Sequence, residues 1–173
     1  MKLALAVPLL LLAVGCATTS PTPRIPVLDL ADWEVRGKLG VRSPERAGNL
    51  GFHWRQEGYR FTIRFLGPLG VNVGEVSGTA EFATARFDGE LREGPINELL
   101  LEELGGTLPL SYLYWWIRAA PDPASPAERL PSGFRQAGWQ IVATPGDAGL
   151  PRRLDISQGE AMKLRLAALR WQL

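Results

Sequence analysis

Apolar and polar residues alternate with a period of two through most of the segment from residue 33 to residue 91. This alternation is typical of strands that bury one face and expose the other. Because the runs follow one another closely, they predict consecutive antiparallel strands. The clearest runs are 33–42, 49–55 and 59–65, and weaker ones follow at 71–76, 79–84 and 85–91.

The period changes to that of a helix after this region. Pro95 suits the first turn of a helix over 95–104, and Gly105 suits the position after its end. A second helix is predicted over 109–119, followed by a loop over 122–131.

Strand patterns return in the last third of the chain, at 134–137, 139–144, 152–157 and 162–171. In the last run the apolar positions change phase between Leu166 and Leu169, which predicts a β-bulge near Ala167 and Ala168. Strands on both sides of a helical insertion predict a mainly β (α+β) fold, an antiparallel sheet with helices on one side. A curved sheet either fills its concave face with side chains or encloses a ligand cavity, and the pattern leaves both open.

The N-terminal segment is typical of a secretory signal. Lys2 precedes an apolar run over 3–14, which is shorter than the roughly 20 residues that a membrane-spanning helix needs. The run ends at Leu-Ala-Val-Gly-Cys, which resembles the lipobox where bacterial lipoproteins are cleaved and lipidated on the cysteine. Cys16 is the only cysteine of the chain. An ordinary cleavage site beside a free cysteine is the alternative.

We therefore expect a lipoprotein signal peptide at 1–15, a lipidated flexible tether at 16–28 and a folded domain at 29–173. The tether is rich in Thr, Ser and Pro, as flexible linkers are. Ala17 stands where an inner-membrane lipoprotein has an aspartate, so the resemblance implies an outer-membrane anchor.

Composition and charge exclude several classes of protein. The chain has 19 basic and 18 acidic residues, and this near-neutral balance disfavours a nucleic-acid binder. One histidine and one cysteine disfavour a metal cluster and rule out a disulfide within the chain. His53 lies on the polar face of its predicted strand, so we interpret it as a surface residue and predict neither an enzyme nor a cofactor.

Several short motifs, taken together in this order, resemble the LolB family of outer-membrane lipoprotein receptors. They cover the whole predicted domain. They are Trp33…Gly37-Lys38-Leu39, Trp54-Arg55-Gln56, Gly67-Pro68-Leu69-Gly70, Leu108-Pro109-Leu110…Trp116-Ile117…Pro121, Gln136…Gly138-Trp139, Leu150-Pro151 and Leu169-Arg170-Trp171. Ala119-Ala120 stands where a glycine is common in the family, so the end of the second helix is expected to differ.

The resemblance implies an incomplete antiparallel β-barrel whose helical lid encloses a hydrophobic cavity for acyl chains. It also implies that the protein accepts lipoproteins from the periplasmic carrier LolA and inserts them into the outer membrane without ATP. We expect a monomer that faces the periplasm. The partners are LolA, the acyl chains and, through Cys16, the outer membrane. A structural lipoprotein or scaffold with a filled core is the alternative.

The resemblance also assigns site residues. The alternating apolar residues of the first strands are the expected cavity wall, namely Trp33, Leu39, Leu50, Phe52, Trp54, Phe61, Ile63 and Phe65. The expected lid residues are Leu99, Leu100, Leu113, Trp116 and Ile117. From periodicity alone, both sets fit a packed core equally well.

The segment Gly67-Pro68-Leu69-Gly70 predicts a type I turn with Leu69 at its tip. From the residues alone, Leu69 would fold back onto the core. In the LolB family the matching leucine protrudes and promotes membrane insertion, so the resemblance assigns this role to the four residues 67–70.

A ring of basic residues lies on the polar face of the predicted strands, namely Arg36, Lys38, Arg42, Arg60 and Arg64. It suits either contact with the carrier or an ordinary solvated face.

Overall fold

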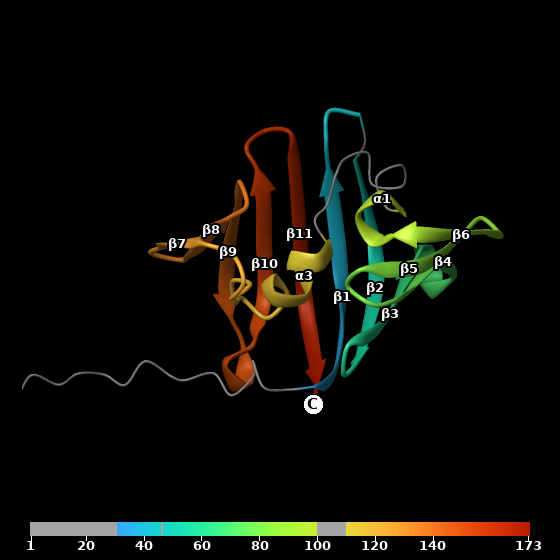
Figure 1. Ribbon diagram of the computed structural model, residues 1–173, viewed down its shortest axis with the longest axis horizontal. Coiled ribbons are helices and arrows are strands. Elements are labelled where there is room, and N and C mark those ends of the chain that lie inside the picture. The colour runs from blue at the N-terminus through green and yellow to red at the C-terminus, as the bar shows by residue number, and fades with distance from the viewer. Residues whose placement is uncertain (1–30, 46, 100–109) are drawn as a thin grey trace, which may run out of the picture.

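The structure is a computed structural model that describes residues 31–45, 47–99 and 110–173 (Figure 1). The expected signal peptide, the tether with Cys16, residues 100–104 of the first predicted helix and Gly105 after it therefore lie outside the described residues.

The described residues form eleven strands and two short helices. The strands are β1 (Asp32–Arg42), β2 (Ala47–Glu57), β3 (Arg60–Leu66), β4 (Asn72–Gly78), β5 (Phe82–Phe87), β6 (Glu90–Pro95), β7 (Ala127–Leu130), β8 (Gly133–Gln136), β9 (Trp139–Pro145), β10 (Pro151–Gln158) and β11 (Met162–Gln172). The helices are α1 (Ile96–Leu99) and α3 (Leu110–Trp116), and 3-10 turns occupy Pro68–Gly70 and Asp147–Gly149.

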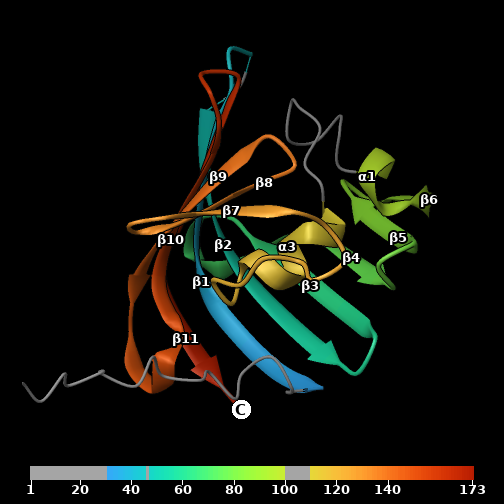
Figure 2. The same ribbon diagram turned by 60° about the vertical axis from the view of Figure 1, so that its left-hand side comes forward.

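All strands belong to one antiparallel sheet in the order β6-β5-β4-β3-β2-β1-β11-β10-β9-β8-β7. The first and last strands of the chain, β1 and β11, pair at its centre. The sheet curves without closing, and α3 lies over its concave face (Figures 1 and 2). This architecture confirms the predicted mainly β fold, an incomplete antiparallel barrel.

Two predicted boundaries are wrong. The predicted loop 122–131 contains the edge strand β7, whose side chains are almost all exposed and therefore carry no apolar alternation. The predicted break between residues 84 and 85 is absent, since the β5–β6 turn lies at Asp88-Gly89. Both turn residues have positive φ, 51° and 84°, as an Asp-Gly hairpin turn requires.

The end of α3 keeps a left-handed cap although no glycine stands there. Ala119 has φ 59°, its N–H donates to the carbonyl of Trp116, and the N–H of Ala120 donates to the carbonyl of Trp115. These bonds form a Schellman motif. The left-handed conformation explains why glycine suits this position.

The predicted bulge in the last strand is confirmed. Between the pairs Arg36–Arg170 and Lys38–Ala167, β11 holds one residue more than β1, and Ala168 has φ 53°. Gly37 lies opposite the bulge, where a Cβ atom would come within 2.8 Å of Leu169 Cδ2 and 2.9 Å of the Ala167 carbonyl oxygen. The two central strands therefore approach each other closely only because residue 37 has no side chain.

Gly37→Ala is expected to lower the free energy of unfolding by about 1–3 kcal/mol, because the added methyl group overpacks the β1–β11 seam. Urea unfolding measures the loss. Gly48→Ala is the matched control, since a Cβ at Gly48 in β2 meets nothing within 4 Å. Equal stabilities of the two variants would contradict the argument.

Candidate functional site

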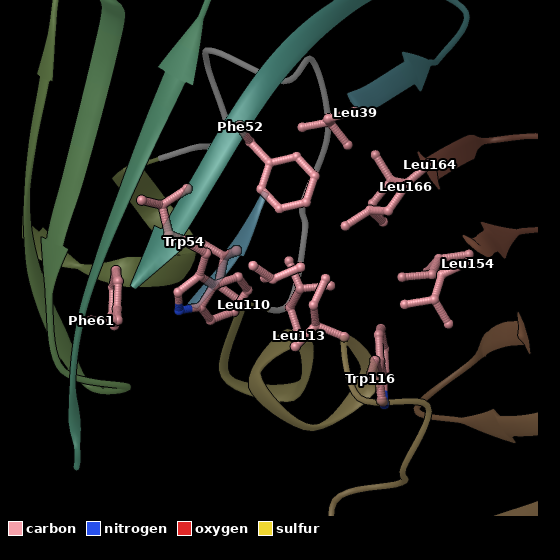
Figure 3. Close-up of a cluster of buried hydrophobic side chains, with 14 of the residues drawn as sticks. Leu39, Phe52, Trp54, Phe61, Leu110, Leu113, Trp116, Leu154, Leu164 and Leu166 are labelled. Carbon is pink, nitrogen blue, oxygen red and sulfur yellow. The ribbon is translucent and has the colours of Figure 1, made fainter. Parts of the chain in front are cut away.

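The centre of the concave face is filled by side chains. Leu113 and Trp116 point from α3 toward leucines of β10 and β11, and Phe52 and Leu39 close the cluster from β2 and β1 (Figure 3). All of these side chains are buried. This half of the interior is a packed core.

An apolar cavity of about 650 Å³ lies beside the filled region, between α3 and strands β2 and β3. Its volume falls within the range of small-molecule sites, roughly 300–1,000 Å³. Its apolar lining comes mainly from Trp54, Phe61, Ile63, Ile96, Leu110, Tyr114 and Trp115. The sheet therefore fills one part of its concave face and leaves a hollow in another.

Helix α3 separates the two regions. Leu113 and Trp116 face the packed core, whereas Ser111, Tyr114 and Trp115 line the cavity. Residues three or four apart share one side of a helix, so the two sets lie on different sides of α3. One helix thus packs the core and covers the cavity.

The predicted wall residues divide between the two regions. Trp54, Phe61 and Ile63 line the cavity. These three residues also belong to the buried core cluster. The buried side chains of Trp33, Leu39, Phe52 and Phe65, and the half-buried Leu50, pack in that cluster without lining the cavity.

The predicted lid residues Leu99, Leu113, Trp116 and Ile117 are also buried in the core cluster, and Leu100 lies outside the described residues. Sequence reasoning missed Leu110, Tyr114 and Trp115. Their helical spacing identifies a shared face, but no pattern in the sequence shows which face of α3 meets an empty space.

The mouth of the cavity lies at the end of the sheet where β3 begins. Its rim includes Gly58, Tyr59 and the turn residues 79–81, and Tyr59 is 77% exposed. Buried Gln56 accepts a hydrogen bond from Trp54 Nε1 (3.1 Å) and donates to the Gly58 carbonyl (2.8 Å). Because these polar atoms satisfy one another, they leave the cavity wall apolar.

A buried glutamine fixes the other side of α3. Gln136 Oε1 accepts hydrogen bonds from Trp116 Nε1 and the Asp122 N–H, both 2.9 Å. Its Nε2 donates to the carbonyls of Asp122 and Ser125, both also 2.9 Å. Each donor and acceptor of the amide is used, so strand β8 holds both the helix and the loop after it.

A buried arginine follows α3. The Arg118 guanidinium carbon lies 4.2 Å from the ring centre of Tyr114, 5.0 Å from that of Trp115 and 5.9 Å from that of Trp33. Burial lowers the pKa of Arg118. These cation–π contacts join the cavity-lining end of α3 to the first strand.

The turn after β3 presents Leu69 to solvent with its whole side chain exposed (102%). Leu69 has φ 61° and ψ 11°, so the predicted type I turn is wrong, because that turn has a negative φ at its third residue. Left-handed backbone costs a leucine roughly 1–2 kcal/mol. The Leu69 side chain is therefore exposed on a strained backbone, and it lies close in the chain to the exposed Val71 and Val73.

The same turn occurs a second time in the chain. Gly146-Asp147-Ala148-Gly149 matches Gly67–Gly70, with Ala148 (φ 54°) in place of Leu69. In both turns the first glycine N–H donates to the carbonyl four residues ahead, at 2.8 Å. The turn therefore also forms with alanine at this position, so its backbone conformation does not require the leucine side chain of residue 69.

The polar face of the sheet carries ion pairs. Glu34 contacts His53 Nε2 at 3.0 Å and two arginines, Arg36 and Arg55, at 3.6 Å. The hydrogen bond with His53 lowers the pKa of Glu34. Arg64 pairs with Glu75 at 2.8 Å. Of the predicted basic ring, Arg36 and Arg64 thus have carboxylate partners.

Within the described ranges, no three His, Cys, Asp or Glu side chains lie where they could hold a metal ion. In the same ranges, no helix is long and apolar enough to span a bilayer.

Comparisons with known proteins agree with one another. The family model "Outer membrane lipoprotein LolB" matches residues 31–171. The chain is 31% identical to the outer-membrane lipoprotein LolB of Stutzerimonas stutzeri (strain A1501), covering 99% of this chain and 96% of that protein. It is 32% identical to LolB of Pseudomonas aeruginosa (strain LESB58), covering 91% and 82%, and 32% identical to LolB of Thiobacillus denitrificans, covering 91% and 90%. The chain belongs to the LolB family of outer-membrane lipoproteins.

Proposed function

We propose that the cavity beneath α3 binds the acyl chains of lipoproteins and that Leu69 promotes their insertion into the outer membrane. The protein is a receptor of the LolB family, which accepts lipoproteins from LolA and is not an enzyme. The cavity of about 650 Å³, apolar on both walls, is the observation that carries the proposal. Burial of a hydrophobic ligand in this cavity lowers the free energy, so binding needs no reactive group.

Transfer then follows relative affinity. Acyl chains move from carrier to receptor and from receptor to bilayer when each site binds them more tightly than the last, and about 1.4 kcal/mol changes the ratio tenfold. Burying one leucine contributes only about 1.5–3 kcal/mol. Leu69 therefore suits orienting a protein that is already tethered, as lipidation of Cys16 after removal of residues 1–15 would achieve. We further propose that the domain acts as a monomer.

Ser111→Trp tests the cavity, because Ser111 lines it from α3 and is half-buried. The indole would occupy space that an acyl chain needs, so we expect at least a tenfold weaker affinity for a fluorescent fatty acid. The ligand should also raise the melting temperature of the unchanged protein, but not that of the variant.

Ser132→Trp is the matched control, since Ser132 is exposed and lies outside the cavity lining. It should bind the fatty acid like the unchanged protein. Unaltered binding by the Ser111 variant would exclude this cavity as the acyl site. Absence of saturable binding by the unchanged protein would favour a structural lipoprotein.

A further inference from the structure

The convex face of the sheet has a groove of its own, about 530 Å³ in volume, across strands β2, β1, β11 and β10. Its floor includes the small residues Gly40, Ala47 and Gly48. Because these residues have little or no side chain, the surface is hollow between longer side chains of neighbouring strands. The polar residues that line it are Arg42, Asn49, Arg153, Asp155, Ser157, Lys163 and Arg165, and the apolar residues Val41, Ile156 and Leu164 complete the lining.

Strand register concentrates positive charge in this groove. Arg42 on β1 lies directly opposite Lys163 on β11, and Arg165 lies opposite Gly40. Like charges in directly opposed positions destabilise an antiparallel pair. Lys163 Nζ contacts the exposed Glu160 at 2.8 Å, whereas no carboxylate in the described part of the chain forms an ion pair with Arg42. The register thus keeps a repulsion that an acidic residue at either position would remove.

A single carboxylate organises the other two cations. Asp155 accepts a 2.7 Å hydrogen bond from Arg165 Nε on one oxygen and a 2.7 Å bond from Arg153 Nε on the other. Partial burial alone would raise the pKa of Asp155, but the two guanidinium groups outweigh it and hold that pKa below its ordinary value. Both arginines are therefore held in place with further N–H groups left to donate.

The groove lies at the end of the sheet from which Leu69 projects. Strand β3 runs parallel to β1, because each is antiparallel to β2. The turn holding Leu69 follows β3, just as the β1–β2 turn follows Arg42. The β1–β2 and β10–β11 turns also lie together at the top of both views (Figures 1 and 2). The groove and the Leu69 turn therefore lie toward the same edge of the sheet, which is the edge that would face a membrane receiving Leu69.

We propose that this groove binds the phosphate of an anionic glycerophospholipid at the membrane surface. The small floor lets a phosphate approach the sheet, and the arginines and Lys163 supply charge-assisted hydrogen bonds to its oxygens. Asn49 and Ser157 add neutral donors. The inference rests on the proposed function, because the contact of Leu69 with the membrane is what selects a lipid rather than a soluble anion.

Nuclear magnetic resonance tests the site on the full lipidated chain in detergent micelles. The probes are dihexanoylphosphatidylglycerol, dihexanoylphosphatidylcholine and inorganic phosphate. We expect the anionic lipid to shift the backbone amide signals of Gly40 and Gly48 saturably. Phosphatidylcholine and inorganic phosphate should each bind at least tenfold more weakly, and added salt should weaken binding because exposed charges are screened.

The double variant Arg42→Gln/Lys163→Gln should bind the anionic lipid at least tenfold more weakly, since it loses two charge-assisted hydrogen bonds. The matched control Arg60→Gln/Arg86→Gln removes two exposed cations that do not line the groove, and it should bind normally. Equal binding by the groove variant, or equal binding of phosphatidylcholine, would overturn the proposal. Equal affinity for inorganic phosphate would show an anion site without lipid recognition and would also overturn it.

A second experiment separates a lipid from a protein partner. The lipidated chain is reconstituted into phosphatidylcholine vesicles with or without phosphatidylglycerol, and the reactivity of Lys163 toward an amine reagent is measured. Phosphatidylglycerol should protect Lys163 in the absence of any carrier. Protection that requires LolA would assign the groove to the carrier and overturn the lipid site. Fatty-acid binding in the cavity is measured in parallel, so a failure of the groove is distinguishable from a failure of the proposed function.

Discussion

Leu69→Glu is expected to block the delivery of lipoproteins to membranes while leaving the fold and the uptake of acyl chains unchanged. The side chain is fully exposed and lies away from the cavity lining, so its replacement removes no packing. Burying leucine in a bilayer is favourable by about 1.5–3 kcal/mol, which is roughly a 10- to 150-fold effect. A carboxylate loses this gain and resists entry into an apolar phase. The expected decrease in delivery rate is therefore at least about tenfold, measured by flotation of vesicles after transfer from LolA.

The second turn of the same shape supplies the control. Ala148→Glu places the same charge on the same left-handed backbone, in the turn between β9 and β10. It should deliver lipoproteins at the normal rate. Leu69→Asn adds an independent comparison, because asparagine tolerates positive φ and is polar. This variant should be at least as stable as the unchanged protein and still deliver poorly. Normal delivery by both Leu69 variants would refute the role of this side chain.

Gln136→Leu is expected to destabilise the protein by about 3–4 kcal/mol, a large part of the total stability of an ordinary domain. Leucine has a similar size but leaves four hydrogen-bonding groups without their partner. They are the Trp116 indole N–H, the Asp122 N–H and the carbonyls of Asp122 and Ser125. Because these bonds hold α3 and its following loop, fatty-acid affinity should fall as well. Chemical unfolding and probe binding measure the two effects.

Arg135→Leu is the neighbouring control. Arg135 lies on the other face of β8, where its ion pair with Glu128 is exposed and contributes at most about 1 kcal/mol. Gln136→Glu separates hydrogen bonding from packing, since a carboxylate keeps the shape but faces two carbonyls without an N–H to donate. It should be destabilised near neutral pH and partly recover in acid, where the protonated carboxyl donates again. A stable Gln136→Glu protein at neutral pH would contradict this account.

The sequence predicts the strands that bury one face, and the structure shows why other strands were not predicted. Runs such as β1 and β3 bury every second side chain, so their alternation is visible. Strand β7 is held by backbone pairing to β8 and buries almost nothing, so no periodicity marks it. The bulge near Ala168 was predictable because an extra residue changes the phase of the buried positions.

The candidate site was only partly predictable for a different reason. A buried aromatic residue looks the same in a sequence whether it meets another side chain or an empty space. Phe52 and Phe61 both point inward from the sheet and both belong to the buried core cluster, yet only Phe61 also lines the cavity. What separates them is the placement of α3, which depends on distant partners such as Gln136. The exposure of Leu69 likewise depends on a left-handed backbone that its residue type disfavours.

The cavity mouth and Leu69 lie at opposite ends of β3. This strand has seven residues, so at about 3.4 Å each its ends are roughly 20 Å apart. If Leu69 enters the bilayer as proposed, the rim at Tyr59 stays roughly 20 Å from the inserted loop. That distance is about two thirds of the hydrocarbon thickness of a bilayer, which is about 30 Å. An acyl chain that leaves by the rim reaches the lipid only after the domain tilts about its inserted loop. Leu69 would then be the pivot of that tilt.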